Sequence, residues 1–246
     1  MSNFDYALAT QQNPRPAGDG CTPFRISGGP RAVMASAHAL ETAMNDTSSR
    51  PLIVGIGGAA RPLSSSETAL RLALQSAEQY GARTELFGGT ELTALPHYLG
   101  HEDVGDMGRR LLTAIRAADG VIIASPAYHG SISGLVKNAI DYIEATARDS
   151  RAYLDGLPVG LIVCAYGWQA TGSTLTALRS IVHALRGWPT PFGAGLNTSS
   201  GIFKDGVCTD LRAAAQLELV GRQVAEFAET QRTKAKTTTL HAGVGA

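Results

Sequence analysis

The sequence predicts an α/β protein: a doubly wound, five-stranded parallel sheet with helices on both faces. From Pro51 onward, short apolar segments alternate with longer segments in which apolar residues recur at helical spacing. The short segments are almost wholly hydrophobic, which is typical of strands buried on both faces. Because crossovers between parallel strands are right-handed, this alternation indicates helices above and below one sheet.

The elements follow in strand–helix order. The first strand ends in glycines, and the helix after it begins at three serines and is closed by Gly81. The second strand leads into an irregular connection, and the third is expected to stop at Ser125-Pro126. The expected strands cover residues 51–58, 82–87, 120–125, 157–167 and 190–197. The expected helices cover residues 64–81, 104–119, 133–148, 173–187 and 209–231, and the irregular connection covers 88–103.

The two ends of the chain differ from this pattern. Residues 1–49 form an N-terminal extension rich in Pro and Gly, 50–231 form the α/β domain, and 232–246 resemble a frayed C-terminal tail. Within the extension, 31–46 has the spacing of a short amphipathic helix that packs on the domain or on a neighbouring subunit; disorder is the alternative. Its apolar face would comprise Val33, Met34, Ala37, Leu40 and Met44.

Composition excludes several classes of function. Lys+Arg and Asp+Glu are equal at 21 each, so the basic excess of a nucleic-acid binder is missing. The three cysteines, Cys21, Cys164 and Cys208, lack metal-type spacing, and an odd count fits a reducing compartment. No apolar run approaches the roughly 20 residues that cross a bilayer, and the N-terminus does not read as a signal peptide. We therefore expect a soluble, cytoplasmic protein.

Ligands of doubly wound sheets bind at the carboxyl ends of strands, so the loops after the first, third and fourth strands are the candidates. The first loop joins glycines to a helix N-terminus, with Arg61 and the hydroxyls of Ser64, Ser65 and Ser66. This arrangement favours an anion such as a phosphate monoester. It matches neither the dinucleotide fingerprint nor the P-loop. Ordinary serine capping with a solvated Arg61 is the alternative.

The other two loops carry aromatic residues. In the second, Pro126 and Gly130 shape a turn that presents Tyr128 and His129 to the edge or face of a flat heteroaromatic ring; a plain turn is the alternative. The third, "AYGWQATGS", ends a buried strand with Tyr, Gly and Trp, which suggests that something planar is covered there. Alternatively, Trp168 packs over the sheet edge.

From about Leu52 to Phe227 the chain resembles the NAD(P)H-dependent FMN reductases of the flavodoxin-like superfamily. "GGAARPLSSSETAL" is similar to that family's Gly-Ser-x-Arg-x-x-Ser phosphate loop. "SPAYHGSISGLVKNAIDYI" is similar to its longer and more specific flavin loop, Ser-Pro-x-Tyr-x-Gly-Ser-x-x-Gly-x-x-Lys-Asn. The resemblance implies a flavodoxin-like fold. The chain departs from the family pattern at Ala59 (usually Ser), His129 (commonly Asn) and Ser133 (commonly Pro).

Carried over by position, the resemblance implies three groups of flavin contacts. Arg61, Ser64 and Ser66 would hold the FMN phosphate, with Ser65 replacing the hydroxyl missing at Ala59. One side of the isoalloxazine ring would be lined by Pro126, Ala127, Tyr128, His129 and Gly130, and the other by Tyr166 and Gly167.

The resemblance also implies an activity: NAD(P)H reduces FMN by direct hydride transfer from the nicotinamide to flavin N5. No protein acid is required for that step, and His129 is the one candidate proton donor. Reduced FMN would leave for a partner flavin-dependent monooxygenase, or stay bound and reduce a quinone, azo compound, metal ion or other small acceptor. Family members commonly form homodimers or homotetramers. The alternatives are an electron carrier, against which zero net charge argues, and a flavin-binding protein without turnover.

The sequence leaves the nucleotide open. Arg61 and Arg109 are candidates for contact with the 2′-phosphate of NADPH, but no spacing favours NADPH over NADH. It also leaves open the final acceptor and whether FMN is a substrate or a bound prosthetic group.

Overall fold

The structure is a computed structural model that describes residues 49–100 and 104–243. The helix expected at 31–46 and Cys21 lie outside these ranges. No helix within them is long and apolar enough to span a membrane.

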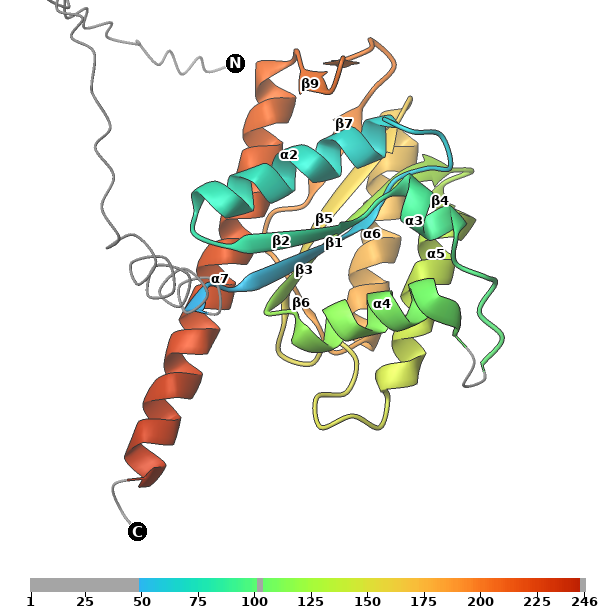
Figure 1. Ribbon diagram of the computed structural model, residues 1–246. Coiled ribbons are helices and arrows are strands. Elements are labelled where there is room, and N and C mark those ends of the chain that lie inside the picture. The colour runs from blue at the N-terminus through green and yellow to red at the C-terminus, as the bar shows by residue number, and fades with distance from the viewer. Residues whose placement is uncertain (1–48, 101–103, 244–246) are drawn as a thin grey trace, which may run out of the picture. The chain divides into compact units, whose positions relative to one another are not determined.

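The sheet has the predicted parallel core. Its strands run in the order β2, β1, β3, β5, and both β6 and β7 pair in parallel with β5 at the far edge (Figure 1). The chain therefore winds outward in opposite directions from the neighbouring pair β1 and β3, as a doubly wound sheet requires. The bounds are Leu52–Gly57 for β1, Arg83–Phe87 for β2, Gly120–Tyr128 for β3, Pro158–Ala165 for β5, Trp188–Pro189 for β6 and Ala194–Asn197 for β7.

The fifth strand is present, but it is broken into β6 and β7. The pairing register jumps from Pro189 opposite Val159 to Ala194 opposite Ile162. Between them, the Thr190 hydroxyl donates to the Phe192 carbonyl at 2.9 Å and closes a local turn. Proline cannot donate to a strand ladder, so Pro191 favours this break at an edge strand.

Helices cover both faces of the sheet, as predicted. Helices α2 and α7 pack on one face, and α4, α5 and α6 on the other (Figure 1). The side chains of β1 alternate accordingly. Ile53 packs among the buried side chains of α2 and α7, whereas Val54 and Ile56 lie in the core on the side of α4, α5 and α6. The bounds are Ser65–Gln79 for α2, Gly89–Thr93 for α3, Gly105–Ala117 for α4, Gly134–Asp141 for α5, Trp168–Ala184 for α6 and Leu211–Gly243 for α7.

Helices α2 and α7 approach each other backbone to backbone at Gly221. A Cβ built on Gly221 would lie 2.1 Å from the carbonyl oxygen of Ala73, so only glycine fits there. One turn away, the Ser76 hydroxyl donates to the carbonyl of Glu218 at 2.9 Å. This contact fixes α7 beside α2, where α7 covers β3, β5 and β7.

Several helices differ from the prediction. The connection 88–103 contains the short helix α3, and α6 begins at Trp168 rather than at 173. The helix expected over 133–148 is α5 followed by a 3₁₀ segment, η1 (Tyr142–Thr146).

The expected frayed tail is also largely helical, because α7 continues to Gly243 and its last part projects beyond the sheet (Figure 1). Residues 232–242 contain no Gly or Pro. Arg232 also holds the helix to the domain, donating to Asp119 at 2.8 Å and to the carbonyl of Ser49 at 3.1 Å.

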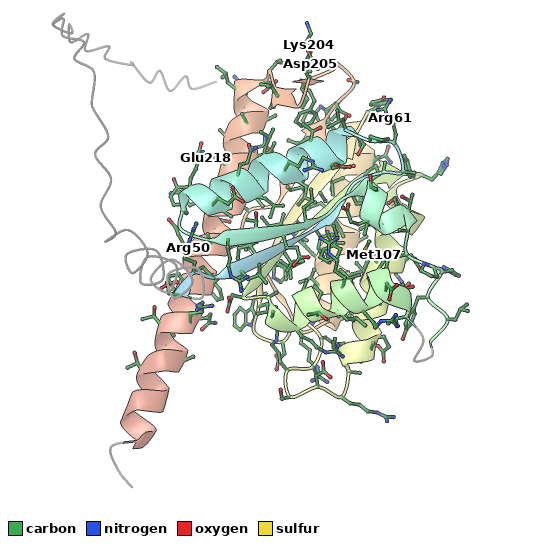
Figure 2. All side chains as sticks on the ribbon, in the orientation of Figure 1. Arg50, Arg61, Met107, Lys204, Asp205 and Glu218 are labelled. Carbon is green, nitrogen blue, oxygen red and sulfur yellow. The ribbon has the colours of Figure 1, made fainter. Side chains whose placement is uncertain are left out.

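Two hairpins were not predicted. The third strand does not stop at Pro126; β3 runs on to Tyr128 and pairs antiparallel with β4 (Ser131–Ile132). A second hairpin joins β8 (Phe203–Lys204) to β9 (Val207–Cys208). Its turn lies at the same end of the domain as Arg61, as the labels of Lys204 and Asp205 show (Figure 2).

Candidate functional site

The loop between β1 and α2 is folded around Ser64. The Ser64 hydroxyl oxygen accepts the backbone N–H of Glu67 at 3.3 Å, which caps α2, and that of Ala59 at 3.1 Å, which closes the loop. Leu63 takes a left-handed conformation with φ of 52°, which turns the chain back toward the helix. The sequence thus builds a tight loop over a helix N-terminus.

The groups that this loop presents to solvent are cationic and polar. Arg61 is exposed, and no acidic side chain of the described residues pairs with it. Ser65 is half-buried, whereas Ser66 is buried with its oxygen 3.4 Å from that of Ser64. Arg61, Ser65 and the first N–H groups of α2 are therefore the accessible groups of a candidate anion site, and Ser64 and Ser66 lie beneath them.

A buried carboxylate that the sequence analysis did not single out supports the loop from below. Glu67 accepts hydrogen bonds from Arg71 at 2.6 and 3.0 Å and from the backbone N–H of Gly89 at 3.1 Å. A Cβ on Gly89 would lie 2.0 Å from the carbonyl oxygen of Ala59, so the two loops are in direct contact. The Arg71 guanidinium balances the charge that Glu67 places near the anion site. Glu67 lies three residues after Ser64, which is the spacing of a capping box, and this pattern in the sequence could have identified Glu67.

The loop after β3 is a two-residue β-hairpin turn. Tyr128 pairs with Ser131, and His129 and Gly130 between them have φ of 52° and 83°. Two successive positive φ angles define a type I′ turn, which favours Asn or Asp followed by Gly. Histidine is among the residues that tolerate the left-handed region, so His129 fits where Asn is common in the family.

Serine hydroxyls hold this hairpin on both sides. The Ser125 hydroxyl accepts the N–H of Ser133 at 3.0 Å and donates to the carbonyl of Pro126 at 2.9 Å. From α6, the Ser173 hydroxyl donates to the carbonyl of Gly130 at 2.9 Å. The turn is thereby fixed to β3, to the start of α5 and to α6.

Aromatic rings stand exposed at the second and third loops. Tyr128 is 54% exposed, Tyr166 79% and Trp168 67%. Most of the Trp168 side chain is therefore in solvent, and only a minor part of it can pack over the sheet edge. Gly167, between Tyr166 and Trp168, is the N-cap residue of α6, and its carbonyl accepts the N–H and the hydroxyl of Thr171 at 3.1 and 2.9 Å.

The three loops lie along one edge of the sheet, the one formed by the carboxyl ends of its strands, because β1, β3 and β5 are parallel neighbours. The candidate anion site at the start of α2 is thus followed, strand by strand, by two loops with exposed rings. Such an edge suits a planar molecule that carries an anionic group. The described residues contain no group of three His, Cys, Asp or Glu side chains that could hold a metal ion.

The thiol of Cys164, near the end of β5, is not part of the exposed surface. It is buried, and burial raises its pKa to about 12. A thiol with so high a pKa stays protonated at neutral pH and is a poor nucleophile.

The fold and this edge place the protein in the flavodoxin-like class of α/β proteins. The family model for NADPH-dependent FMN reductase matches residues 51–197, and the chain belongs to that family. The match spans all three loops.

Two curated relatives are azoreductases. The NADPH azoreductase of Bacillus sp. (strain OY1-2) is 34% identical over 95 residues, which is 38% of this chain and 48% of that protein. The FMN-dependent NADPH-azoreductase of Staphylococcus saprophyticus subsp. saprophyticus is 41% identical over 81 residues, 33% of this chain and 39% of that protein. The chain thus spans less than half the length of these relatives.

Solved structures agree on the fold. FerB, a flavoenzyme NAD(P)H:(acceptor) oxidoreductase from Paracoccus denitrificans, superposes with a TM-score of 0.58 at 21% identity, over 73% of this chain and 98% of FerB. The apo form of EmoB, an NADH:FMN oxidoreductase, gives 0.56 at 19% identity, over 73% of this chain and 89% of EmoB.

Proposed function

We propose that the protein is an NAD(P)H-dependent FMN oxidoreductase. The observation that carries this proposal is the single edge at which an anion site at the start of α2 adjoins the exposed rings of Tyr128 and Tyr166. Family membership supports it independently.

The residues of the phosphate end fit FMN. Arg61 supplies a planar guanidinium, which suits bidentate contact with a phosphate, and Ser65 supplies a hydroxyl. Ser64 and Ser66 contribute from within the loop: the Ser64 oxygen holds the N–H of Ala59 and so shapes the backbone that faces the phosphate. Glu67 and Arg71 support this loop and do not contact the ligand.

The residues of the ring end fit a flat heterocycle. A Cβ on Gly167 would meet no atom within 4 Å, so the backbone there is open to close approach by a ligand. Pro126, Ala127, Tyr128, His129 and Gly130 would line one side of the ring, and Tyr166 and Gly167 the other. FMN, when bound there, supplies two-electron chemistry by accepting a hydride from the nicotinamide. The chain's part is to align the two rings and to aim N–H donors of the β3–β4 turn at the ring edge.

An azo compound or quinone is the acceptor class that we favour, with FMN retained as a prosthetic group. The azoreductase names of the curated relatives support this choice. Delivery of reduced FMN to a flavin-dependent monooxygenase is the second candidate within the same chemistry. We also propose a homodimer or homotetramer, which light scattering of the purified chain would test.

The test is oxidation of NADPH and NADH by the full chain, with and without added FMN and with an azo dye as acceptor. Turnover of the dye without added FMN supports a prosthetic flavin. Turnover that appears only with FMN and saturates with it supports the monooxygenase-supplying reductase. Bound flavin with no oxidation of either nucleotide would overturn the proposal in favour of a flavin-binding protein.

A further inference from the structure

A second polar site lies beside the candidate flavin edge. A groove of about 470 Å³ is lined by Trp168, Asn197, Ser199, Ser200 and Arg212. Asn197 ends β7 and pairs with Ala165, the last residue of β5, so the groove opens at the same end of the sheet as the flavin loops. Trp168 joins the two regions, because it follows Tyr166 and Gly167 directly and also lines the groove.

The groove offers a cation whose charge is available. Arg212 is exposed in the first turn of α7, and in the part of the chain that the structure describes no acidic side chain pairs with its guanidinium. The carboxylate of Asp210 also lines the groove, but it is directed to the backbone: one oxygen accepts the N–H groups of Arg212 and Ala213 at 2.8 and 2.9 Å.

Its other groups recognise hydroxyls, phosphates and flat rings. Ser199 and Ser200 are exposed and carry hydroxyl donors. The side-chain oxygen of Asn197 accepts the N–H of Ser199 at 3.0 Å, which turns the amide so that its NH₂ group remains for a ligand. The indole of Trp168, 67% exposed, is a platform on which a purine can stack.

We propose that this groove binds the adenosine 2′-phosphate end of NADPH. The inference rests on the proposed function, because the flavin phosphate is assigned to Arg61 and the α2 loop. A second phosphate-type site at the same edge then suits a second ligand that is itself phosphorylated. Arg212 contacts the 2′-phosphate, the two serines donate to it, and Trp168 stacks on the adenine. Arg109, considered above for this role, instead pairs with Asp106 at 2.5 Å on α4.

The assignment makes Arg212 a determinant of nucleotide choice. An arginine–phosphate contact stabilises NADPH and leaves NADH, which has no 2′-phosphate, almost unaffected. The protein should therefore prefer NADPH, and the preference should depend on this residue.

The test uses fragments of the nucleotide on the full chain. Isothermal titration with 2′,5′-ADP and with 5′-AMP should show tighter binding of 2′,5′-ADP. Arg212→Gln should weaken 2′,5′-ADP about tenfold and leave 5′-AMP within about twofold, since the variant removes a charged hydrogen bond. Arg222→Gln, on the same helix but outside the groove, is the matched control. Trp168→Leu should weaken both fragments, because both contain adenine.

Activity and flavin titrations separate this inference from the proposed function. Arg212→Gln should bind FMN as the wild type does and should lower kcat/KM for NADPH about tenfold, but not for NADH. Equal losses with both nucleotides, or unchanged 2′,5′-ADP affinity in Arg212→Gln, would overturn the groove assignment while leaving a working FMN oxidoreductase. Loss of the proposed function itself would appear differently, as a wild-type chain that oxidises neither nucleotide, whether or not it binds FMN.

Discussion

Gly130 is the residue at which backbone geometry and the proposed ring contact coincide. Its φ of 83° lies in the left-handed region, and a Cβ there would lie 3.6 Å from the Ser173 oxygen, an ordinary contact. The cost of a side chain at Gly130 therefore comes from the backbone, about 1–2 kcal/mol, and not from a collision.

We expect Gly130→Val to weaken FMN binding at least about tenfold, because the branched side chain would project over the turn and the turn itself would be strained. Quenching of FMN fluorescence measures the affinity, and far-ultraviolet circular dichroism monitors the fold. Gly156→Val is the matched control: Gly156 has φ of 74° and no atom within 4 Å of its Cβ position, but it lies outside the three loops. Equal losses of FMN affinity in both variants would argue against a ring contact at Gly130.

Arg61 tests the phosphate end separately from the ring end. Arg61→Gln should weaken FMN about tenfold and leave riboflavin unchanged, because riboflavin lacks the phosphate. Parallel titrations with the two flavins check this. The exposed Arg148, which follows η1, provides the control variant Arg148→Gln. A similar loss with both flavins would place Arg61 elsewhere than at the phosphate.

Among the elements, the crossing of α2 and α7 gives the clearest prediction of stability. Gly221→Ala should lower the free energy of unfolding by about 1–3 kcal/mol, because the added methyl group would lie against backbone atoms of α2. Gly172→Ala, in α6, should raise it by about 0.5–1 kcal/mol, because no atom lies within 4 Å of that Cβ position and alanine favours helix. Urea unfolding of both variants measures the two changes, which should be opposite in sign.

The elements also show what the sequence could and could not predict. Long apolar or periodic segments such as β1, β5 and α4 were predicted, because burial sets their composition. The hairpins are short: β4, β8 and β9 have only two residues each, too few to show the alternation of apolar and polar residues that predicts a strand. Asp205-Gly206 is nevertheless a hairpin signal that the sequence contained.

The candidate site was predictable loop by loop but not in its contacts. Arg61, the serine run and the Tyr-His-Gly turn are adjacent in sequence, so local patterns indicate them. The bond from Ser173 to Gly130 joins residues 43 positions apart, and it exists only because α6 packs beside the β3–β4 turn. No local pattern encodes a contact of that kind.

The molecule as a whole should lose stability at high pH through Cys164. Its folded pKa of about 12 lies above the ordinary thiol value of 9.0, so above about pH 9 the unfolded chain releases a proton that the folded chain retains. The free energy of unfolding should therefore be unaffected below pH 9 and should fall between pH 9 and 12, by up to roughly 4 kcal/mol. Burial raises the pKa of Tyr142 as well, which acts in the same direction.

Urea unfolding from pH 7 to 11 of the wild type and of Cys164→Ala measures this contribution. The alkaline decline should be shallower in Cys164→Ala, and Cys208→Ala should retain most of the wild-type slope, because the charge of Cys208 is the smaller of the two causes that raise the pKa of Cys164. Identical slopes in all three proteins would show that Cys164 does not carry the effect.

The serine contacts of the three loops have a consequence for binding kinetics. Ser64, Ser125 and Ser173 each join a loop to the neighbouring backbone when the chain folds. The conformational entropy of these loops is therefore lost during folding rather than on association with a ligand. A preorganised edge of this kind should bind flavin in one kinetic phase whose rate rises linearly with flavin concentration, without a slow isomerisation step.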